Sequence, residues 1–151
     1  MREPYTKLYC HLDWATWDRL PLITEEMEPR LYGAIRTKLH ELRCQPVAMG
    51  GVEDHMHCLC RFNPVISIPY LVQQVKGSTS HLTSHEITPA QAFKWQGAYG
   101  AFTVSYDLVA QVKAYVLGQK QHHANQELWP EWETTFITEG ESEEVGAAQP
   151  A

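Results

Sequence analysis

Alternation of apolar and polar residues predicts four β-strands. Along residues 5–14 (YTKLYCHLDW), Leu8, Cys10, Leu12 and Trp14 share one face and polar residues occupy the other. Successive side chains of a strand point to opposite faces, so this pattern is typical of a half-buried strand. Similar short apolar runs predict further strands at residues 46–49, 55–62 and 100–105.

Apolar residues at helical spacing lie between and after these strands. Thr24 is expected to cap a helix that runs to about residue 43, and Ser67 a second helix to about residue 81. Residues 106–123 form a third helical pattern. The pair Gly50-Gly51 is expected to turn the chain between the second and third strands.

The predicted order is β-α-β-β-α-β followed by a C-terminal helix. This is the ferredoxin-like (RRM-like) α+β plan, an antiparallel sheet with two helices on one face. We expect one domain over residues 1–138. The fourth strand would lie at a sheet edge, where Gly100, Phe102 and Val104 would form an exposed apolar face.

Net charge and composition bear on the partners and the location that the protein can have. The net charge is −6, but four of the 18 acidic residues fall in residues 139–151, an acidic tail expected to be disordered. The rest of the chain is nearly neutral, so charge does not exclude nucleic acid. No apolar run suits a membrane span and the first ten residues lack a signal core, so we expect a cytoplasmic protein.

The segment 54–60, DHMHCLC, combines two histidines with two cysteines. On a strand, His55 and His57 share one face while Cys58 and Cys60 share the other. A zinc site needs all four side chains to converge, which a regular strand prevents, so the cysteines are expected in the core. The histidines are either surface residues or two ligands of a metal site that needs a third ligand from elsewhere.

The C-terminal helical pattern offers that third ligand. In residues 112–123, VKAYVLGQKQHH, Tyr115 and Gln119 are four apart and therefore share a helix face. His122 and His123 follow one turn later. If this helix packs on the open side of the sheet, it brings Tyr115 and Gln119 over the two histidines of the third strand.

Five segments in the same order resemble the single-tyrosine transposases of the HUH superfamily, which include the REP-associated tyrosine transposases. They span about residues 5–125 and read HLDWATWDRLPLIT, GGVEDHMHCLC, SIPYLVQQVKGSTS, FKWQGAYGAFTVS and AYVLGQKQHH. The chain departs from the family pattern at Ala98, where a glycine is usual. Gly118 inside the catalytic helix is a second departure, since glycine there costs about 1 kcal/mol relative to alanine.

The resemblance implies cleavage and joining of single-stranded DNA that carries hairpins. Mg²⁺ or Mn²⁺ would be held by His55, His57 and the amide oxygen of Gln119, and imidazole ligands favour Mn²⁺. Tyr115 would attack the scissile phosphate and form a 5′-phosphotyrosine. The active unit would be a homodimer in which the tyrosine and the histidines come from different subunits, although the sequence leaves a site within one subunit open.

Other candidate roles are less closely tied to motifs. Residues that could contact DNA phosphates or bases lie on the open face of the first strand or near loops, namely Lys7, His11, Arg19, Lys76, Lys94 and Trp95. Two alternatives remain at this stage. One is a domesticated nuclease that processes chromosomal hairpin repeats, and the other is a non-catalytic nucleic-acid-binding module.

Overall fold

The computed structural model describes residues 2, 4–87 and 93–125 and contains one antiparallel sheet of four strands. The strands are β1 (Tyr9–Ala15), β2 (Gln45–Gly51), β3 (His55–Arg61) and β4 (Gly100–Val104), in the order β2-β3-β1-β4. This confirms the predicted α+β class and the antiparallel ferredoxin-like plan. The predicted acidic tail and the domain boundary at residue 138 lie outside the described residues.

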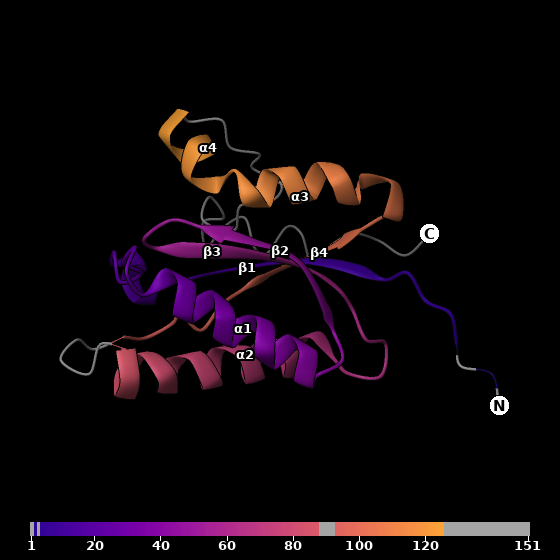
Figure 1. Ribbon diagram of the computed structural model, residues 1–151, viewed down its shortest axis with the longest axis horizontal. Coiled ribbons are helices and arrows are strands. Elements are labelled where there is room, and N and C mark those ends of the chain that lie inside the picture. Colours follow the sequence, from indigo (N-terminus) through magenta and orange to yellow (C-terminus); the bar gives the residue numbers. More distant parts are fainter. Residues whose placement is uncertain (1, 3, 88–92, 126–151) are drawn as a thin grey trace, which may run out of the picture.

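Helices cover both faces of the sheet (Figure 1). On one face lie α1 (Glu28–Glu41) and α2 (Ile68–Leu82), and on the other lie α3 (Val109–Leu117) and α4 (Gln119–Asn125). Three short elements complete the described chain: η1 (Trp17–Arg19), η2 (Thr83–Ile87) and η3 (Tyr106–Leu108). None of the helices in the described ranges has the length and apolar character that crossing a bilayer requires.

The ends of the helices are set by local capping and backbone chemistry rather than by the spacing of apolar residues. Ser67 caps α2 as predicted, because its hydroxyl accepts a hydrogen bond from the Tyr70 backbone N–H at 3.2 Å. The first helix starts at Glu28 and not directly after Thr24, with a proline in its first turn. The predicted helix over residues 106–123 is in fact divided, because Gly118 ends α3 and α4 begins at the next residue.

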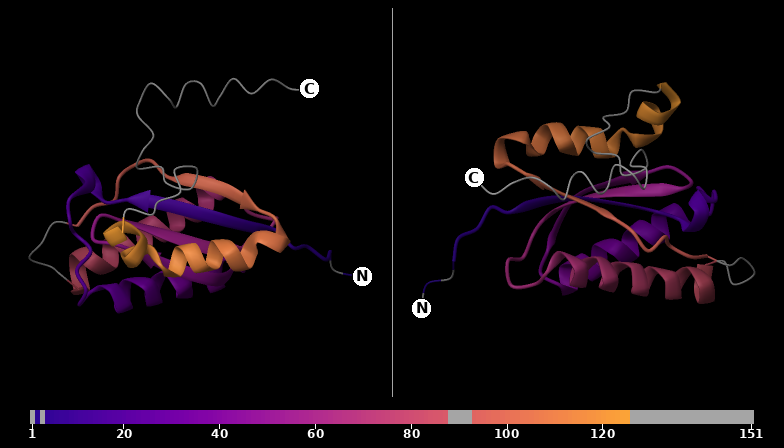
Figure 2. Two further views of the ribbon diagram at one scale, coloured as in Figure 1. Left: turned by 90° about the horizontal axis from the view of Figure 1, so that it is seen from above. Right: turned by 180° about the vertical axis from the view of Figure 1, so that it is seen from behind.

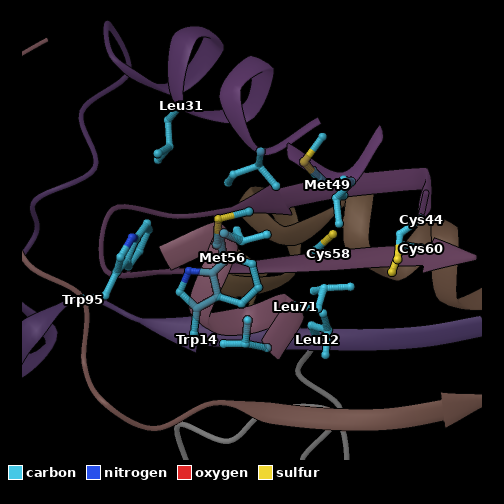
Figure 3. Packing of buried hydrophobic residues seen from close by; sticks show 14 of the residues in the cluster. Leu12, Trp14, Leu31, Cys44, Met49, Met56, Cys58, Cys60, Leu71 and Trp95 are labelled. Atoms are coloured by element: carbon cyan, nitrogen blue, oxygen red, sulfur yellow. The ribbon is translucent and has the colours of Figure 1, made fainter. Parts of the chain in front are cut away.

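The faces of β3 separate as the alternation predicts. Met56, Cys58 and Cys60 join the main core under α1 and α2, where Figure 3 shows Cys58 and Met56 beside other buried side chains. Leu59 points to the other face and packs with Val116 of α3 in a second, smaller cluster. The cysteines are buried free thiols. The zinc interpretation of the DHMHCLC segment is therefore excluded in favour of a core role for its cysteines.

Gly50 and Gly51 are the last residues of β2 rather than a turn, so that prediction was wrong. A Cβ atom on Gly50 would lie 1.9 Å from the Val116 carbonyl oxygen, and one on Gly51 would lie 2.4 Å from the His55 carbonyl oxygen. Neither glycine has a positive φ. The need for glycine at residue 50 is therefore steric, because the backbone of α3 rests directly on β2.

The edge position of β4 is confirmed, but its predicted exposed apolar face is wrong. Gly100 and Val104 are buried and Phe102 is half-buried. Val104 packs in the same cluster as Val112 and Val116, because α3 folds back from β4 across the sheet towards β2 (Figure 2). Leu8, expected on the core face of the first strand, precedes β1 and is exposed.

The contact between Gly50 and α3 gives a test of this packing. Gly50→Ala is expected to lower the free energy of unfolding by about 2 kcal/mol, because the added methyl group pushes the helix off the sheet. Gly33→Ala is the matched control: Gly33 lies in α1, and a Cβ there meets nothing within 4 Å. It is expected to raise stability by about 0.5–1 kcal/mol through helix propensity. Urea unfolding of both variants measures the two effects, and equal stabilities would contradict the close approach.

Candidate active site

His55 and His57 lie on the face of β3 that α3 and α4 cover. Both side chains are buried, with 1% and 0% of their surface exposed. Their ring centroids are 5.3 Å apart and the rings are nearly perpendicular. Strand geometry alone brings two imidazoles to one place under the C-terminal helices, as residues two apart on a strand share a face.

Asp54 fixes the orientation of the His55 ring. Burial alone would raise the pKa of Asp54, but hydrogen bonds from His55 and Arg19 outweigh it and lower the pKa to about 2. The carboxylate is therefore ionised at neutral pH and can only accept, so His55 Nδ1 carries the proton of the 2.7 Å hydrogen bond to Asp54. The lone pair of the neutral ring is then on Nε2. A carboxylate behind a ligating histidine is a common arrangement at metal sites.

His57 is held by residues of β1. Its Nδ1 lies 2.8 Å from His11 Nε2 and 3.9 Å from an Asp13 carboxylate oxygen. With the tautomer that carries its proton on Nδ1, as the nearby carboxylate favours, His57 donates to His11 and its lone pair is on Nε2. Both predicted histidine ligands thus have Nδ1 engaged and Nε2 as the atom suited to bind a metal.

The C-terminal helices bring Tyr115 and Gln119 to the same place. The Tyr115 ring meets His57 edge-on with centroids 5.9 Å apart, and His122 stacks on it at 5.0 Å. Tyr115 is 2% exposed and Gln119 is 1% exposed. All of these side chains belong to one chain, so a single subunit brings the tyrosine next to the histidine pair.

The amide of Gln119 is held at both ends. Its Nε2 donates to the Tyr115 carbonyl oxygen at 3.1 Å, and its Oε1 accepts from His123 Nε2 at 3.1 Å. The ring of His123 also meets the ring of His55 with centroids 4.6 Å apart. His123 is therefore in contact with residues of two different elements in the site.

The donor set suits a divalent ion. Two imidazole Nε2 atoms and one amide oxygen are ligands that Mn²⁺ accepts, with positions left for substrate oxygens. Within residues 2, 4–87 and 93–125, no group of three or more His, Cys, Asp or Glu side chains is arranged to hold a metal. A site here therefore depends on Gln119 or on ligands from the substrate. The core thiols do not contribute ligands to such a site. Burial is the main cause that raises the pKa of the Cys10 thiol to about 12, so this thiol stays protonated at neutral pH.

A cavity of about 460 Å³ opens next to Asp54, the hydrogen-bond partner of His55. Its charged walls include Arg19 and Asp54, which pair with each other, and Lys120, which bonds Glu28 at 2.8 Å. His123 lines the same cavity. The site is thus closed over Tyr115 but adjoins a polar space next to His123.

The residues expected to contact DNA fall into two groups. Lys7 and Lys94 are placed over the rings of Tyr106 and Trp17, at 4.0 and 3.9 Å. Lys76 donates to the carbonyls of residues 96 and 98, and burial lowers the pKa of Lys76 to about 8. Like Arg19, these three have a polar end near the surface.

His11 and Trp95 do not fit that expectation. His11 is fully buried and bonds His57. Trp95 is 5% exposed, packs against Trp14 and donates its indole N–H to Thr79. Both side chains are covered by their own chain, so we reassign His11 to the support of the site and Trp95 to the core.

Sequence reasoning missed the supporting residues. Asp54 directly precedes His55, and Asp13 shares the face of His11 on the first strand, so a signal for both was present. The pairing of His123 with Gln119 was visible as an i, i+4 relation. No sequence signal predicted that Arg19 would adopt a positive φ of 54° and reach Asp54.

Comparisons with known proteins identify the family of this chain. The family model described as "Transposase IS200 like" matches residues 4–119. A candidate transposase from Deinococcus radiodurans R1 is similar in structure, with 27% identity, a TM-score of 0.63, and coverage of 77% of this chain and 93% of that chain.

A REP-associated tyrosine transposase bound to a REP hairpin shares the fold. It is 14% identical with a TM-score of 0.60, and the match covers 85% of this chain and 74% of that one. No curated protein matches the chain. The family match spans well over half of the sequence, and the chain belongs to the IS200-like transposases, a family of DNA-cleaving enzymes.

Proposed function

We propose that this transposase cleaves and rejoins hairpin-bearing single-stranded DNA through a 5′-phosphotyrosine intermediate. The observation that carries the proposal is the meeting of Tyr115, Gln119 and the histidine pair on one side of the sheet. A hydroxyl nucleophile, two imidazoles and an amide oxygen are the groups that such a reaction requires. The hairpin preference is supported by the fold shared with the transposase bound to a REP hairpin.

In the cleavage step, the Tyr115 oxygen forms a bond to the scissile phosphorus and the bond from phosphorus to the 3′ oxygen breaks. The phenolic proton is lost, the departing 3′ oxygen gains a proton, and the phosphate remains bonded to the 5′ oxygen of the downstream fragment. Attack by another 3′-hydroxyl on the phosphotyrosine reverses these changes and joins the strands without an external energy source.

His55 and His57 would hold Mg²⁺ or Mn²⁺ through Nε2, with Gln119 Oε1 as the third protein ligand. When bound, such an ion supplies Lewis-acid stabilisation of charge on the phosphate oxygens. The protein prepares this site by locking both rings through Nδ1, to Asp54 and to His11. The burial of Tyr115 keeps water from the phosphotyrosine, and we expect DNA to displace the stacked His122 when it enters.

The direct test is a gel assay for the covalent adduct. Labelled single-stranded DNA with a hairpin is incubated with the protein and Mn²⁺, next to the same sequence as a blunt duplex. Adduct is expected only with the single-stranded substrate. Efficient cleavage of the duplex would refute the proposed substrate class.

Tyr115→Phe is expected to bind the hairpin with an affinity close to that of the wild type and to form no adduct. The change removes only the phenolic oxygen and keeps the ring between His57 and His122. Hairpin binding by fluorescence anisotropy and adduct formation by gel are measured on the same preparations. Adduct at the wild-type level would exclude Tyr115 as the nucleophile.

Removal of the ligands should affect cleavage in a graded order. His55→Ala and His57→Ala are expected to abolish cleavage, and Gln119→Ala to weaken it less, because a neutral amide is a poorer ligand than imidazole. Cys58→Ser is the control on the opposite face of β3 and should keep metal-dependent cleavage. The initial cleavage rate of each variant is measured over a range of Mn²⁺ concentrations. A Cys58→Ser protein that no longer responds to Mn²⁺, together with a His57→Ala protein that still does, would contradict the assignment of the ligands.

We also propose that the enzyme acts as a homodimer. Among the strands of the described residues, β4 pairs on one side only, with β1, and α3 follows it after the short η3. The tyrosine could then act on the histidine pair of the same subunit, as the single chain arranges it, or on that of a partner. The sequence resemblance favours the shared arrangement, and the two differ in what a mixed dimer can do.

Mixing Tyr115→Phe with His57→Ala protein separates the two arrangements. A shared site gives one intact centre in each mixed dimer, so we expect cleavage to return in part. A site within one subunit leaves every centre defective, and cleavage stays absent. Heterodimers are verified by two affinity tags, and no recovery in verified heterodimers would rule out the shared site for this step.

A further inference from the structure

We propose that His123 is a positioning residue that turns the Gln119 amide so that its oxygen, and not its nitrogen, is presented to the metal. The inference rests on the proposed function and deepens it, since it concerns the third ligand of the same site. The carrying observation is the 3.1 Å hydrogen bond from His123 Nε2 to Gln119 Oε1, between two side chains at the base of the site.

An amide ligand, like an imidazole, must be turned so that the correct atom faces the metal. The two ends of the Gln side chain have nearly the same shape, but only the oxygen has lone pairs for a metal. Here the nitrogen end donates to the Tyr115 carbonyl and the oxygen end accepts from His123. A reversed amide would set its oxygen against the Tyr115 carbonyl oxygen and, with the His123 proton on Nε2, its N–H against that N–H. The two hydrogen bonds together therefore permit one orientation.

Gln119 Oε1 can accept the hydrogen bond from His123 and still bind an ion. A carbonyl oxygen has two lone pairs, and the N–H of His123 uses one of them. The His123 ring also contacts the His55 ring, with centroids 4.6 Å apart. The oxygen end of the amide is thus bonded to a side chain that itself touches one of the predicted histidine ligands.

The break in the helix at Gly118 makes this arrangement available. Gly118 has φ −91° and ψ 15°, which ends α3 and lets α4 start at Gln119. Gln119 and His123 are then four residues apart in one helix and share a face. A Cβ atom at Gly118 would lie 3.0 Å from the His122 ring, so glycine also leaves room for the histidine that stacks on Tyr115.

Mn²⁺ affinity of the DNA-free protein, measured by calorimetry, tests the inference without reference to cleavage. His123→Leu removes the donor and should weaken Mn²⁺ binding about tenfold, the lower end of what loss of a ligand's hydrogen-bond partner costs. His123→Gln keeps an N–H donor at a similar reach and should stay within about threefold of the wild type. His40→Leu, a histidine exposed on α1, is the matched control and should bind as the wild type does.

A double-mutant cycle with Gln119→Ala separates positioning from direct ligation. If His123 acts through Gln119, His123→Leu should cause no further loss in the Gln119→Ala background. An equal loss in both backgrounds would overturn the proposal, because His123 would then act on the metal or on the fold independently. Wild-type affinity in His123→Leu, or failure of His123→Gln to restore binding, would also overturn it.

Thermal unfolding of each variant in the absence of metal checks that the variant is folded. If His123→Leu does not fold, His123→Asn replaces it, because the shorter amide places its N–H too near the backbone to reach Gln119. A wild-type protein that forms no adduct refutes the proposed function. If the wild type forms adduct and His123→Leu binds Mn²⁺ as tightly as the wild type, this inference alone is refuted. A wild type that binds no Mn²⁺ also overturns this inference.

Discussion

The contact between the backbone of α3 and Gly50 of β2 is the constraint on which the site depends. No side chain separates the helix from the strand there, since even a methyl group would reach to 1.9 Å of the Val116 carbonyl oxygen. Val112 and Val116 then pack with Leu59 and Val104 around this point. Tyr115 is adjacent to Val116 in the chain, so the same contact that seats the helix sets how far the tyrosine stands from His57.

A second requirement is the fixed orientation of the two imidazoles. It is met by groups outside the histidine motif: Asp54 for His55, and His11 with Asp13 for His57. Arg19 supports Asp54 from a left-handed backbone conformation, a position that costs of the order of 1 kcal/mol for a residue other than glycine. Such strain is retained where the surroundings fix it, and here it places a cation against the carboxylate that holds the first histidine.

Sequence reasoning reached the fold and the central residues because both depend on local pattern. Alternation along residues 55–61 separated the histidines from the cysteines, and the four-residue spacing of Tyr115 and Gln119 placed them on one helix face. It failed where tertiary contacts decide. Gly50 looked like a turn because its steric partner is Val116, far along the chain. His11 and Trp95 looked available to DNA because nothing local shows that His11 is buried against His57 and that the core encloses Trp95.

The two C-terminal helices are held with very different strength, and this bears on how DNA reaches a buried tyrosine. α3 buries Val112, Tyr115 and Val116, whereas among the residues of α4 only Gln119 is buried. The ion pair of Lys120 with Glu28 holds α4, yet the lysine side chain is 56% exposed, and pairs of this kind contribute at most about 1 kcal/mol. Gly118 separates the two helices. The chain therefore joins a firmly seated nucleophile and the buried Gln119 to a more exposed segment that carries His122 and His123, so the His122 ring over Tyr115 can yield to a substrate while the tyrosine keeps its place.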